Sequence, residues 1–300
     1  MKRRTFFKNS LVAGAATFAG LSLPLGREAV AKASPFNMKF SPDFGLFADV
    51  AGKVPEDQIR WGHDNGFHAW ECTFLQRHPL EEQNKISNTL QKLGMDFGQF
   101  VGTMDFKQVT FAGRDESIRD NVLKEVRASV EVAKRMNTKF IHNVLGMADP
   151  RLPWDFQLAN AKRVAEIYEP HGLVMVMETM NHKINHPGMF LHSLPQSYAM
   201  AKAVDSPSVK LLCDVYHVQI QEGNLIPSID YAWDQIAYFQ IGDTPGRFEP
   251  MSGEINYKNL LQHIWDKGYR GFLGLEHSSS MPGKAGDLAV LEAYKQVDPS

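Results

Sequence analysis

Side chains that carry oxygen ligands lie at or near the ends of five of the short apolar runs in this 300-residue chain: Glu71, Glu178, Asp214, Gln240 and Glu276. If the last four runs are strands of one closed sheet, three carboxylates and one amide gather at its mouth. Carboxylates so close together repel one another unless a cation lies between them. Carboxylate and amide oxygens are hard ligands, which suit Mg²⁺ or Mn²⁺ better than Zn²⁺. The pattern therefore predicts a divalent-metal site at Glu178, Asp214, Gln240 and Glu276.

Each of these residues has a simpler interpretation when it is taken alone. A single acid after a strand often caps a helix or forms an ion pair, and this interpretation is favoured for Glu71. Four hard donors on four consecutive runs favour the metal site, because the carboxyl ends of barrel strands surround the active site. Glu71 stays a candidate for substrate binding beside that site.

Three histidines also lie near the ends of apolar runs: His142, His217 and His277. His217 follows Asp214 and could donate a hydrogen bond to a substrate oxygen or titrate near neutral pH. A purely structural role is equally compatible with His217 and is favoured for the other two. His142 is retained as a second candidate for contact with substrate.

Arg247 lies in a loop of turn-forming residues, 242–250, after the seventh apolar run. Proline and glycine set turns in this loop, and a guanidinium there could bind the carboxylate or polyol end of a substrate. An ion pair of Arg247 with Glu249 or Glu254 is an equally good explanation. Arg247 is therefore a substrate-binding candidate with an open alternative.

The rest of the chain indicates a fold that brings these distant segments together. Short β-rich apolar runs alternate with segments of helical periodicity, which is typical of βα units and a parallel sheet. The runs lie at 38–47, 68–73, 96–102, 138–146, 173–180, 209–217, 236–243 and 271–277. Helical patterns lie at 79–93, 115–136, 154–171 and 257–267.

Eight strands with intervening helices predict an α/β protein of the (β/α)8 TIM-barrel type. The alternative is a doubly wound open sheet, whose dinucleotide-binding version is disfavoured because no G-x-G-x-x-G follows the first run. Residues 34–300 contain no internal linker or short repeat, so we expect a single barrel domain there.

The first 33 residues differ from this domain. A basic start, MKRRTFFK, precedes an apolar stretch at 10–25 and a small-x-small sequence at 31–33, which is typical of an export signal. Arg3-Arg4 followed by TFFK resembles the twin-arginine type of signal, whose cargo crosses the bacterial inner membrane folded. We expect a periplasmic protein and a transient contact with the twin-arginine export machinery, with an uncleaved membrane anchor as the alternative.

Composition and charge exclude several classes of protein. Hydrophobic residues make up 43% and charged residues 22% of the chain, as in globular domains. The 1–33 segment holds six of the 32 basic residues and one of the 34 acidic ones, which leaves residues 34–300 with a formal charge of −7. This acidity argues against a nucleic-acid partner. Cys72 and Cys213 lie in apolar runs and are expected to be buried free thiols.

Several motifs together resemble the hydroxypyruvate isomerase family, within the xylose-isomerase-like barrels of sugar isomerases and epimerases. The resemblance spans nearly all of residues 38–280 and is strongest after Leu173. The motifs are DVYHVQ at 214–219, YFQIGDTPGR at 238–247, GEINY at 253–257, GYRG at 268–271 and LEH at 275–277.

The resemblance implies a xylose-isomerase-like TIM barrel with one divalent metal, held by Glu178, Asp214, Gln240 and Glu276. It implies that Glu178 and Glu276 also form the proton-transfer pair and that His217 contacts substrate. The loop after Glu178 departs from the family, because Thr179 stands where that branch tends to have proline. This departure leaves the sugar or hydroxy-keto acid substrate undefined.

The hypothesis that follows is isomerisation or epimerisation beside a carbonyl, through an enediolate, with a metal binding the adjacent carbonyl and hydroxyl oxygens. One glutamate would remove a proton and the other would return one. A non-catalytic exported sugar-binding barrel is the main alternative. A metal-dependent phosphodiester hydrolase is a weaker one, because strand-end histidines are few and the domain is acidic. Whether the protein forms a homo-oligomer is left open.

Overall fold

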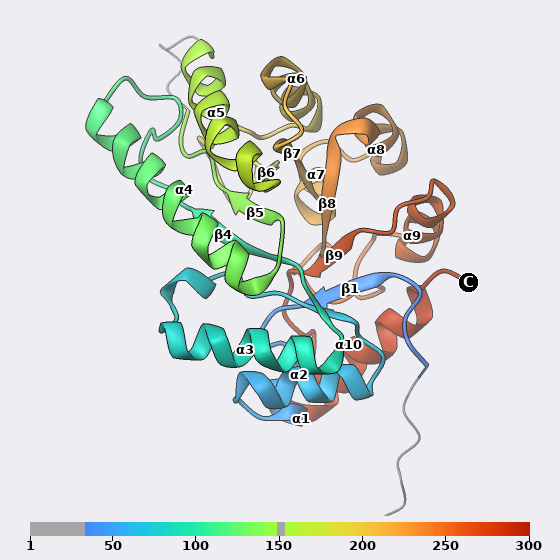
Figure 1. Cartoon of the computed structure of the whole chain (residues 1–300). Coiled ribbons are helices and arrows are strands. Elements are labelled where there is room, and N and C mark those ends of the chain that lie inside the picture. The colour runs from blue at the N-terminus through green and yellow to red at the C-terminus, as the bar shows by residue number, and fades with distance from the viewer. Residues whose placement is uncertain (1–33, 149–153) are drawn as a thin grey trace, which may run out of the picture. The chain divides into compact units, whose positions relative to one another are not determined.

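Strands and helices alternate along the computed structural model, which describes residues 34–148 and 154–300 (Figure 1). The strands are β1 (Lys39–Pro42), β2 (Ala69–Trp70), β3 (Asp96–Phe97), β4 (Gln99–Thr103), β5 (Phe140–Asn143), β6 (Val174–Glu178), β7 (Val209–Asp214), β8 (Ile236–Ile241) and β9 (Phe272–Leu275). The α-helices are α1 (Ala48–Ala51), α2 (Pro55–Asp64), α3 (Leu80–Leu93), α4 (Glu116–Met136), α5 (Asp155–Tyr168), α6 (Leu194–Val204), α7 (Val215–Gln221), α8 (Leu225–Ala232), α9 (Tyr257–Asp266) and α10 (Gly283–Val297). Short 3₁₀ turns lie at Leu75–Arg77, Glu169–His171 and Trp233–Gln235.

The strands form a closed parallel barrel with the helices outside it (Figure 1). Seven strands pair in the order β1-β9-β8-β7-β6-β5-β4, and β2 pairs with β3. A bridge between Asp43 and Glu71 joins the first and second strands. Backbone bonds from Gly98 to Trp70 and from Val101 to Thr73 join the second strand to the third. These links complete the ring and confirm the predicted TIM-barrel class over the open sheet.

Parallel pairing brings the carboxyl ends of the strands to one mouth. Asp214 pairs with Gln240 across β7 and β8, and Glu178 pairs with Leu212, two residues before Asp214. Ile241 pairs with Leu275, the residue before Glu276. Chain segments separated by up to about 100 positions thus present their polar ends together, as active sites of this architecture require.

Apolar side chains fill both faces of the strands. A large cluster lies between helices and sheet, and a smaller one of Phe140, Val176, Leu212 and Tyr238 fills the barrel interior. Cys72 and Cys213 are buried free thiols, as predicted. Burial on both faces explains why the strands read as nearly continuous apolar runs.

Two local predictions were wrong. The third run is not one strand, because Gly98 separates β3 from β4. The sixth run ends at Asp214 rather than at His217, because the Asp214 carboxylate caps helix α7. Its Oδ1 accepts hydrogen bonds from the backbone N–H groups of Tyr216 (2.9 Å) and His217 (3.3 Å). His217 therefore projects from the first turn of a helix, where a cap satisfies otherwise unpaired donors.

The predicted export signal at 1–33 lies outside the described residues. Within the described ranges, the structure has no helix that is both long enough and apolar enough to cross a bilayer.

Gly274 is expected to be essential for the packing of the barrel interior. A Cβ atom at this position of β9 would lie 2.7 and 2.8 Å from the carboxylate oxygens of Glu71. We expect Gly274→Ala to lower the free energy of unfolding by about 1–3 kcal/mol, the usual cost of overpacking. Urea unfolding would measure this change. In a Glu71→Ala background most of the added cost should vanish, and an equal cost in both backgrounds would contradict the assigned clash.

Candidate active site

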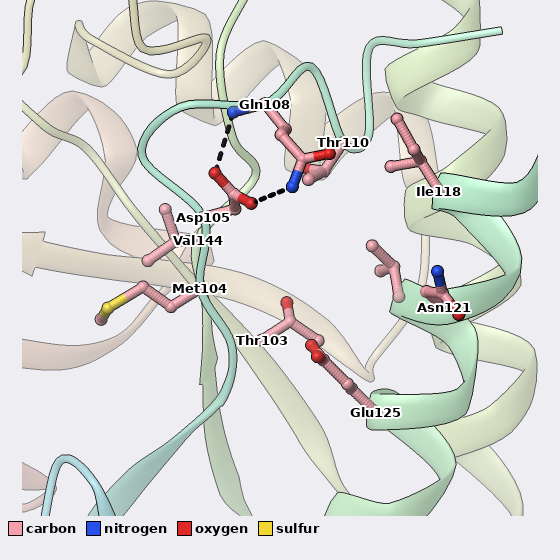
Figure 2. Close-up of a pocket in the computed structure, with 10 residues that line it drawn as sticks. Thr103, Met104, Asp105, Gln108, Thr110, Ile118, Asn121, Glu125 and Val144 are labelled. Carbon is pink, nitrogen blue, oxygen red and sulfur yellow. Dashed lines mark hydrogen bonds between the residues drawn. The ribbon is translucent and has the colours of Figure 1, made fainter. Parts of the chain in front are cut away.

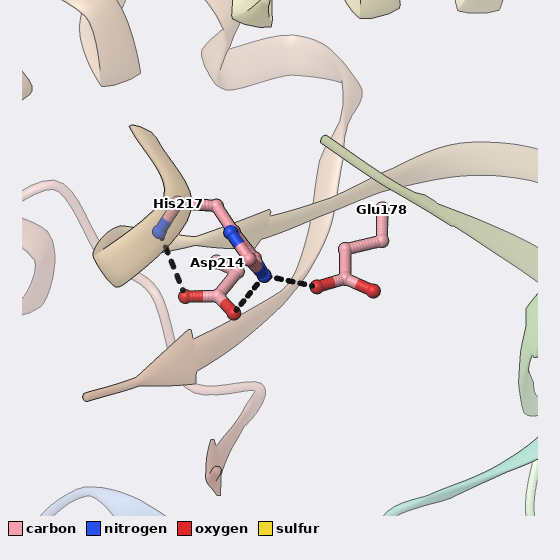
Figure 3. A group of neighbouring side chains, drawn as sticks. All are labelled: Glu178, Asp214 and His217. Atoms are coloured by element: carbon pink, nitrogen blue, oxygen red, sulfur yellow. Dashed lines mark hydrogen bonds and ion pairs between the residues drawn. The ribbon is translucent and has the colours of Figure 1, made fainter. Parts of the chain in front are cut away.

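Glu178, Asp214 and His217 form a buried cluster at the barrel mouth (Figure 3). One ligand atom from each lies within 4.8 Å of the other two, a spacing that could hold a metal ion. The Nε2 atom of His217 lies 3.5 Å from Oε1 of Glu178 and 3.7 Å from Oδ2 of Asp214. Glu178 and Asp214 end strands β6 and β7, and His217 lies in the first turn of α7.

Hydrogen bonding fixes the tautomer of His217. The backbone N–H of Asn181 donates to Nδ1 of His217 at 3.3 Å, and the Asn181 amide nitrogen lies 2.6 Å from the same atom. A backbone N–H can only donate, so Nδ1 accepts and Nε2 carries the hydrogen. In this state His217 offers a donor toward the two carboxylates rather than a free lone pair for a metal.

Gln240 and Glu276 line the same cavity as Glu178 and His217, a space of about 280 Å³. Oε1 of Gln240 is buried and has no hydrogen-bond partner among the described residues. Oε2 of Glu276 likewise accepts no hydrogen bond there, although it contacts Arg247 as an ion pair. Buried polar atoms without partners are rare in folded proteins. The unpaired oxygen of Gln240, beside the carboxylates of Glu178, Asp214 and Glu276, fits a bound Mg²⁺ or Mn²⁺.

Arg247 supplies the positive charge nearest to these acids. Its Nη2 atom lies 2.7 Å from Oδ2 of Asp214 and 3.1 Å from Oε2 of Glu276. The alternative ion pairs with Glu249 or Glu254 do not form. The Arg247 guanidinium also lies 4.8 Å from the ring centroid of Tyr216, which orients its plane. Arg247 therefore points into the mouth, as its candidate role requires.

Burial perturbs the titration of the acids and histidines in the cavity. Loss of solvent raises the pKa of Glu178 well above its ordinary value, and the negative charge of Asp214 raises it further. Burial likewise raises the pKa of Glu276 to about 8 against the opposing effect of Arg247. Burial lowers the pKa of His142 and of His217 to about 4, so both rings are neutral at neutral pH. Shifts of this size are characteristic of sites that transfer protons.

The two remaining candidates lie in different environments. Nε2 of His142 is 3.0 Å from Oε2 of Glu178, and the ring lines the cavity. Glu71 lies inside the barrel, where its carboxylate accepts hydrogen bonds from Tyr238 and Gln99. Glu71 is not among the residues that line the cavity. Contact of Glu71 or His142 with substrate stays a prediction.

Sequence reasoning missed the apolar residues that line this cavity together with the acids. They are Phe74, Met104, Phe106 and Met180. His186 also lines the cavity, and its ring centroid lies 5.2 Å from that of His217. The ring of Phe106 stacks on His186 with centroids 5.0 Å apart, which joins the loop after β4 to the loop after β6. Phe74 and Phe106 are 45% and 39% exposed, so these side chains reach the rim. No spacing in the sequence marks these residues, because only the fold brings them into the same cavity as the acids.

Glu249 forms hydrogen bonds that connect the loop carrying Arg247 to the segment after Glu276. Its buried carboxylate accepts hydrogen bonds from the backbone N–H of Ser280 (2.8 Å) and from the Ser280 hydroxyl. Two further bonds join these segments, from Arg247 Nε to the carbonyl of Glu276 and from Ser278 N–H to the carbonyl of Arg247, each 3.1 Å. These contacts set the position of Arg247 relative to Glu276.

Glu249→Gln is expected to lower kcat/KM by about tenfold with little change in thermal stability. The amide keeps one acceptor for Ser280 but loses the charge, and small displacements of positioning groups are costly in catalysis. Steady-state kinetics and thermal melting would measure both effects. Ser280→Ala should behave similarly, and the double variant should be little worse than either single one. Fully additive losses would contradict a shared contact.

Comparison with known proteins places this geometry in context. Residues 59–295 match the family described as "Xylose isomerase-like TIM barrel". Hydroxypyruvate isomerase of Escherichia coli is 28% identical over 244 residues, covering 77% of this chain and 90% of that protein. The 2-oxo-tetronate isomerase of Pectobacterium atrosepticum is 26% identical over 240 residues, covering 78% and 88%. A human relative, provisionally named hydroxypyruvate isomerase, is 36% identical over 262 residues, covering 80% and 89%.

Solved structures share the fold. A family 2 AP endonuclease from Brucella melitensis superposes with a TM-score of 0.71 at 24% identity, covering 83% of this chain and 96% of that one. D-Psicose 3-epimerase from Clostridium cellulolyticum has a TM-score of 0.70 at 17% identity, covering 87% and 98%. At these identities the likeness concerns the architecture alone. Together with the matched family, it shows that the chain belongs to the xylose isomerase-like TIM barrels.

Proposed function

We propose that this protein is a divalent-metal-dependent isomerase of a small hydroxy-carbonyl compound, of the hydroxypyruvate isomerase type. One observation carries the proposal: Glu178 and Glu276, two acids with raised pKa values, line one cavity with the unpaired oxygen of Gln240. The isomerase names of relatives that match most of the chain support the same reaction class.

Glu178, Asp214, Gln240 and Glu276 are the residues that would hold Mg²⁺ or Mn²⁺. When bound, the ion supplies positive charge that polarises a carbonyl and stabilises negative charge developing on the substrate. His217 is left out of this set, because its Nε2 carries a hydrogen. The Glu178, Asp214 and His217 cluster remains the alternative set, and it would require the other tautomer of His217.

The two glutamates are placed for proton transfer from different sides. β6 and β9 are separated in the sheet by β7 and β8, so Glu178 and Glu276 reach the cavity from strands three positions apart. One carboxylate would remove the proton beside the carbonyl and the other, protonated, would return one. Raised pKa values make a protonated glutamate accessible near neutral pH, which the second role requires.

His217 and Arg247 would orient the substrate. The Nε2–H group of His217 is a donor for a substrate oxygen, and the Arg247 guanidinium is a donor for a carboxylate or hydroxyl. The apolar side chains of Phe74, Met104 and Phe106 would limit the access of water to the cavity. This arrangement suits a small keto acid or ketose that presents its polar atoms to His217 and Arg247.

The experiment that tests the proposal follows hydroxypyruvate, ketoses and aldoses by NMR in heavy water with Mn²⁺ or Mg²⁺. We expect one of them to incorporate deuterium at the carbon beside its carbonyl and to form an isomer. Binding without exchange would favour the sugar-binding alternative. Cleavage of a phosphodiester by the same protein would favour the hydrolase.

We also propose export through the twin-arginine route, on the motif at 1–33 alone. Cell fractionation of the chain and of its Arg3→Lys/Arg4→Lys variant tests this proposal. Wild-type protein is expected in the periplasm and the variant in the cytoplasm. Equal cytoplasmic distribution of both would contradict it.

A further inference from the structure

A second cavity, outside the candidate active site, lies between the loop after β4 and helix α4 (Figure 2). Its volume is about 110 Å³. The polar residues around it are acceptor-rich: Thr103, Asp105, Gln108, Thr110, Asn121 and Glu125. No lysine or arginine of the described ranges lines it. A space of this kind repels anions and attracts a positively charged occupant.

Asp105 is a fixed carboxylate at one side of this cavity. Its oxygens accept hydrogen bonds from the backbone N–H groups of Lys107 (2.7 Å) and Gln108 (2.8 Å) and from the Gln108 side chain (2.7 Å). Partial burial opposes ionisation, but these bonds hold the pKa of Asp105 below its ordinary value. Asp105 therefore stays negatively charged at neutral pH.

Glu125 reaches into the cavity from the opposite side, on helix α4, toward Thr103 (Figure 2). Its carboxylate forms no ion pair or hydrogen bond with another described residue. Glu125 is an exposed residue, but partial loss of solvent around its carboxylate raises its pKa, and the charge of Asp105 raises it further. The charges of the two acids therefore interact across the cavity, and no described lysine or arginine forms an ion pair with either of them.

Thr103 gives an independent indication of an occupant. The residue ends β4 and is 4% exposed, yet its Oγ1 has no hydrogen-bond partner among the described residues. Figure 2 shows this hydroxyl oxygen directed into the space between the loop and the helix. A buried hydroxyl normally forms a hydrogen bond with a protein group or an ordered ligand. The unpaired Oγ1 of Thr103 therefore indicates a bound ligand in this cavity.

We propose that this cavity binds a hard divalent cation of the Ca²⁺ type, with Asp105, Glu125 and the Thr103 hydroxyl as its protein ligands. Oxygen donors of carboxylate and hydroxyl type are those that Ca²⁺ takes, and water molecules complete its shell of six to eight oxygens. The ion neutralises two facing acids and satisfies the Thr103 oxygen at once. The proposal is independent of the isomerase assignment.

Such an ion would tie the loop after β4 to helix α4. That loop carries Met104 and Phe106, which line the cavity of the candidate active site. Cation binding would therefore restrain the segment that covers the substrate cavity. Lys107 and Arg114 are exposed in the same stretch, which makes trypsin a probe of its order.

The test titrates the chelator-treated full chain with CaCl₂ by calorimetry, in an Asp214→Asn background that weakens the other cation site. With two carboxylate ligands we expect a dissociation constant on the order of 10⁻⁴ to 10⁻³ M. Ca²⁺ should also raise the melting temperature and slow tryptic cleavage after Lys107 and Arg114.

Glu125→Gln should lower the Ca²⁺ affinity by at least about tenfold, because the ligand charge falls by half. Thr103→Val keeps the side-chain shape and should weaken Ca²⁺ binding without lowering the melting temperature in chelator. Glu131→Gln is the matched control on α4, since Glu131 pairs with Lys134 away from the cavity. An unchanged Ca²⁺ response in Glu125→Gln would overturn the proposal. The absence of binding at 10 mM Ca²⁺ would also overturn it. Protection from tryptic cleavage by methylammonium in place of Ca²⁺ would do the same.

Discussion

Replacing Glu276 by Gln is expected to lower kcat by about 10²- to 10⁴-fold, the range that general acid–base catalysis contributes. The amide has the same shape but cannot take up or release the proton. The backbone of residue 276 keeps its bonds to Ile241 and Arg247, and Arg247 keeps its contact with Asp214. The loss should therefore come from chemistry rather than from unfolding. Glu178→Gln is expected to behave in the same way.

Steady-state kinetics at saturating Mn²⁺ would measure this effect, with circular dichroism to confirm the fold. Saturation is needed because both glutamates are also proposed metal ligands. Glu254→Gln is the matched control, since Glu254 lies exposed on a nearby loop and accepts a hydrogen bond from Gln219. Full activity of Glu276→Gln would remove the proton-transfer role. Unchanged ligand binding with no activity in the wild type would favour a sugar-binding protein.

The barrel could be predicted because its strands are buried on both faces. Runs such as Val174–Glu178 are apolar almost throughout and end in a polar residue, so both the strand and its functional end are visible in the sequence. Local chemistry at the strand ends was harder to predict. Asp214 both ends β7 and caps α7, and only the hydrogen bonds to residues 216 and 217 show that the chain has become helical.

Contacts between distant loops could not be predicted from the sequence. Arg247 had nearby acids at 249 and 254, yet it pairs with Asp214 and Glu276, which only the closure of the barrel brings within reach. Glu71 has the sequence context of a strand-end ligand, but hydrogen bonds to Tyr238 and Gln99 hold it in the interior. Residue type and spacing identified which groups carry charge. The three-dimensional arrangement decided which of them face each other.

Asp214→Asn is expected to lower the affinity for Mn²⁺ by about 100-fold or more while leaving helix α7 in place. Asparagine caps helices as well as aspartate does, so the bonds from the N–H groups of Tyr216 and His217 can persist. The second carboxylate oxygen, now bonded to Arg247, is replaced by an amide NH₂ group that cannot ligate a cation. Changes outside the ligand shell already cost 10- to 100-fold in metal affinity, so loss of a charged ligand should cost more.

Calorimetric titration with Mn²⁺ would measure this loss, and the melting temperature in chelator would show whether the cap survives. Asp230→Asn serves as the control, because Asp230 pairs with Lys267 and His263 at the surface and does not line the cavity. In Asp214→Asn the Arg247 guanidinium keeps its ion pair with Glu276 and loses the one with Asp214. Its affinity for a substrate carboxylate should therefore increase or stay unchanged, while the affinity for Mn²⁺ falls. Parallel loss of metal and carboxylate binding would mean that Asp214 positions Arg247 for substrate. Undiminished Mn²⁺ binding would show that the cation is held without Asp214, and the proposed ligand set would then be wrong.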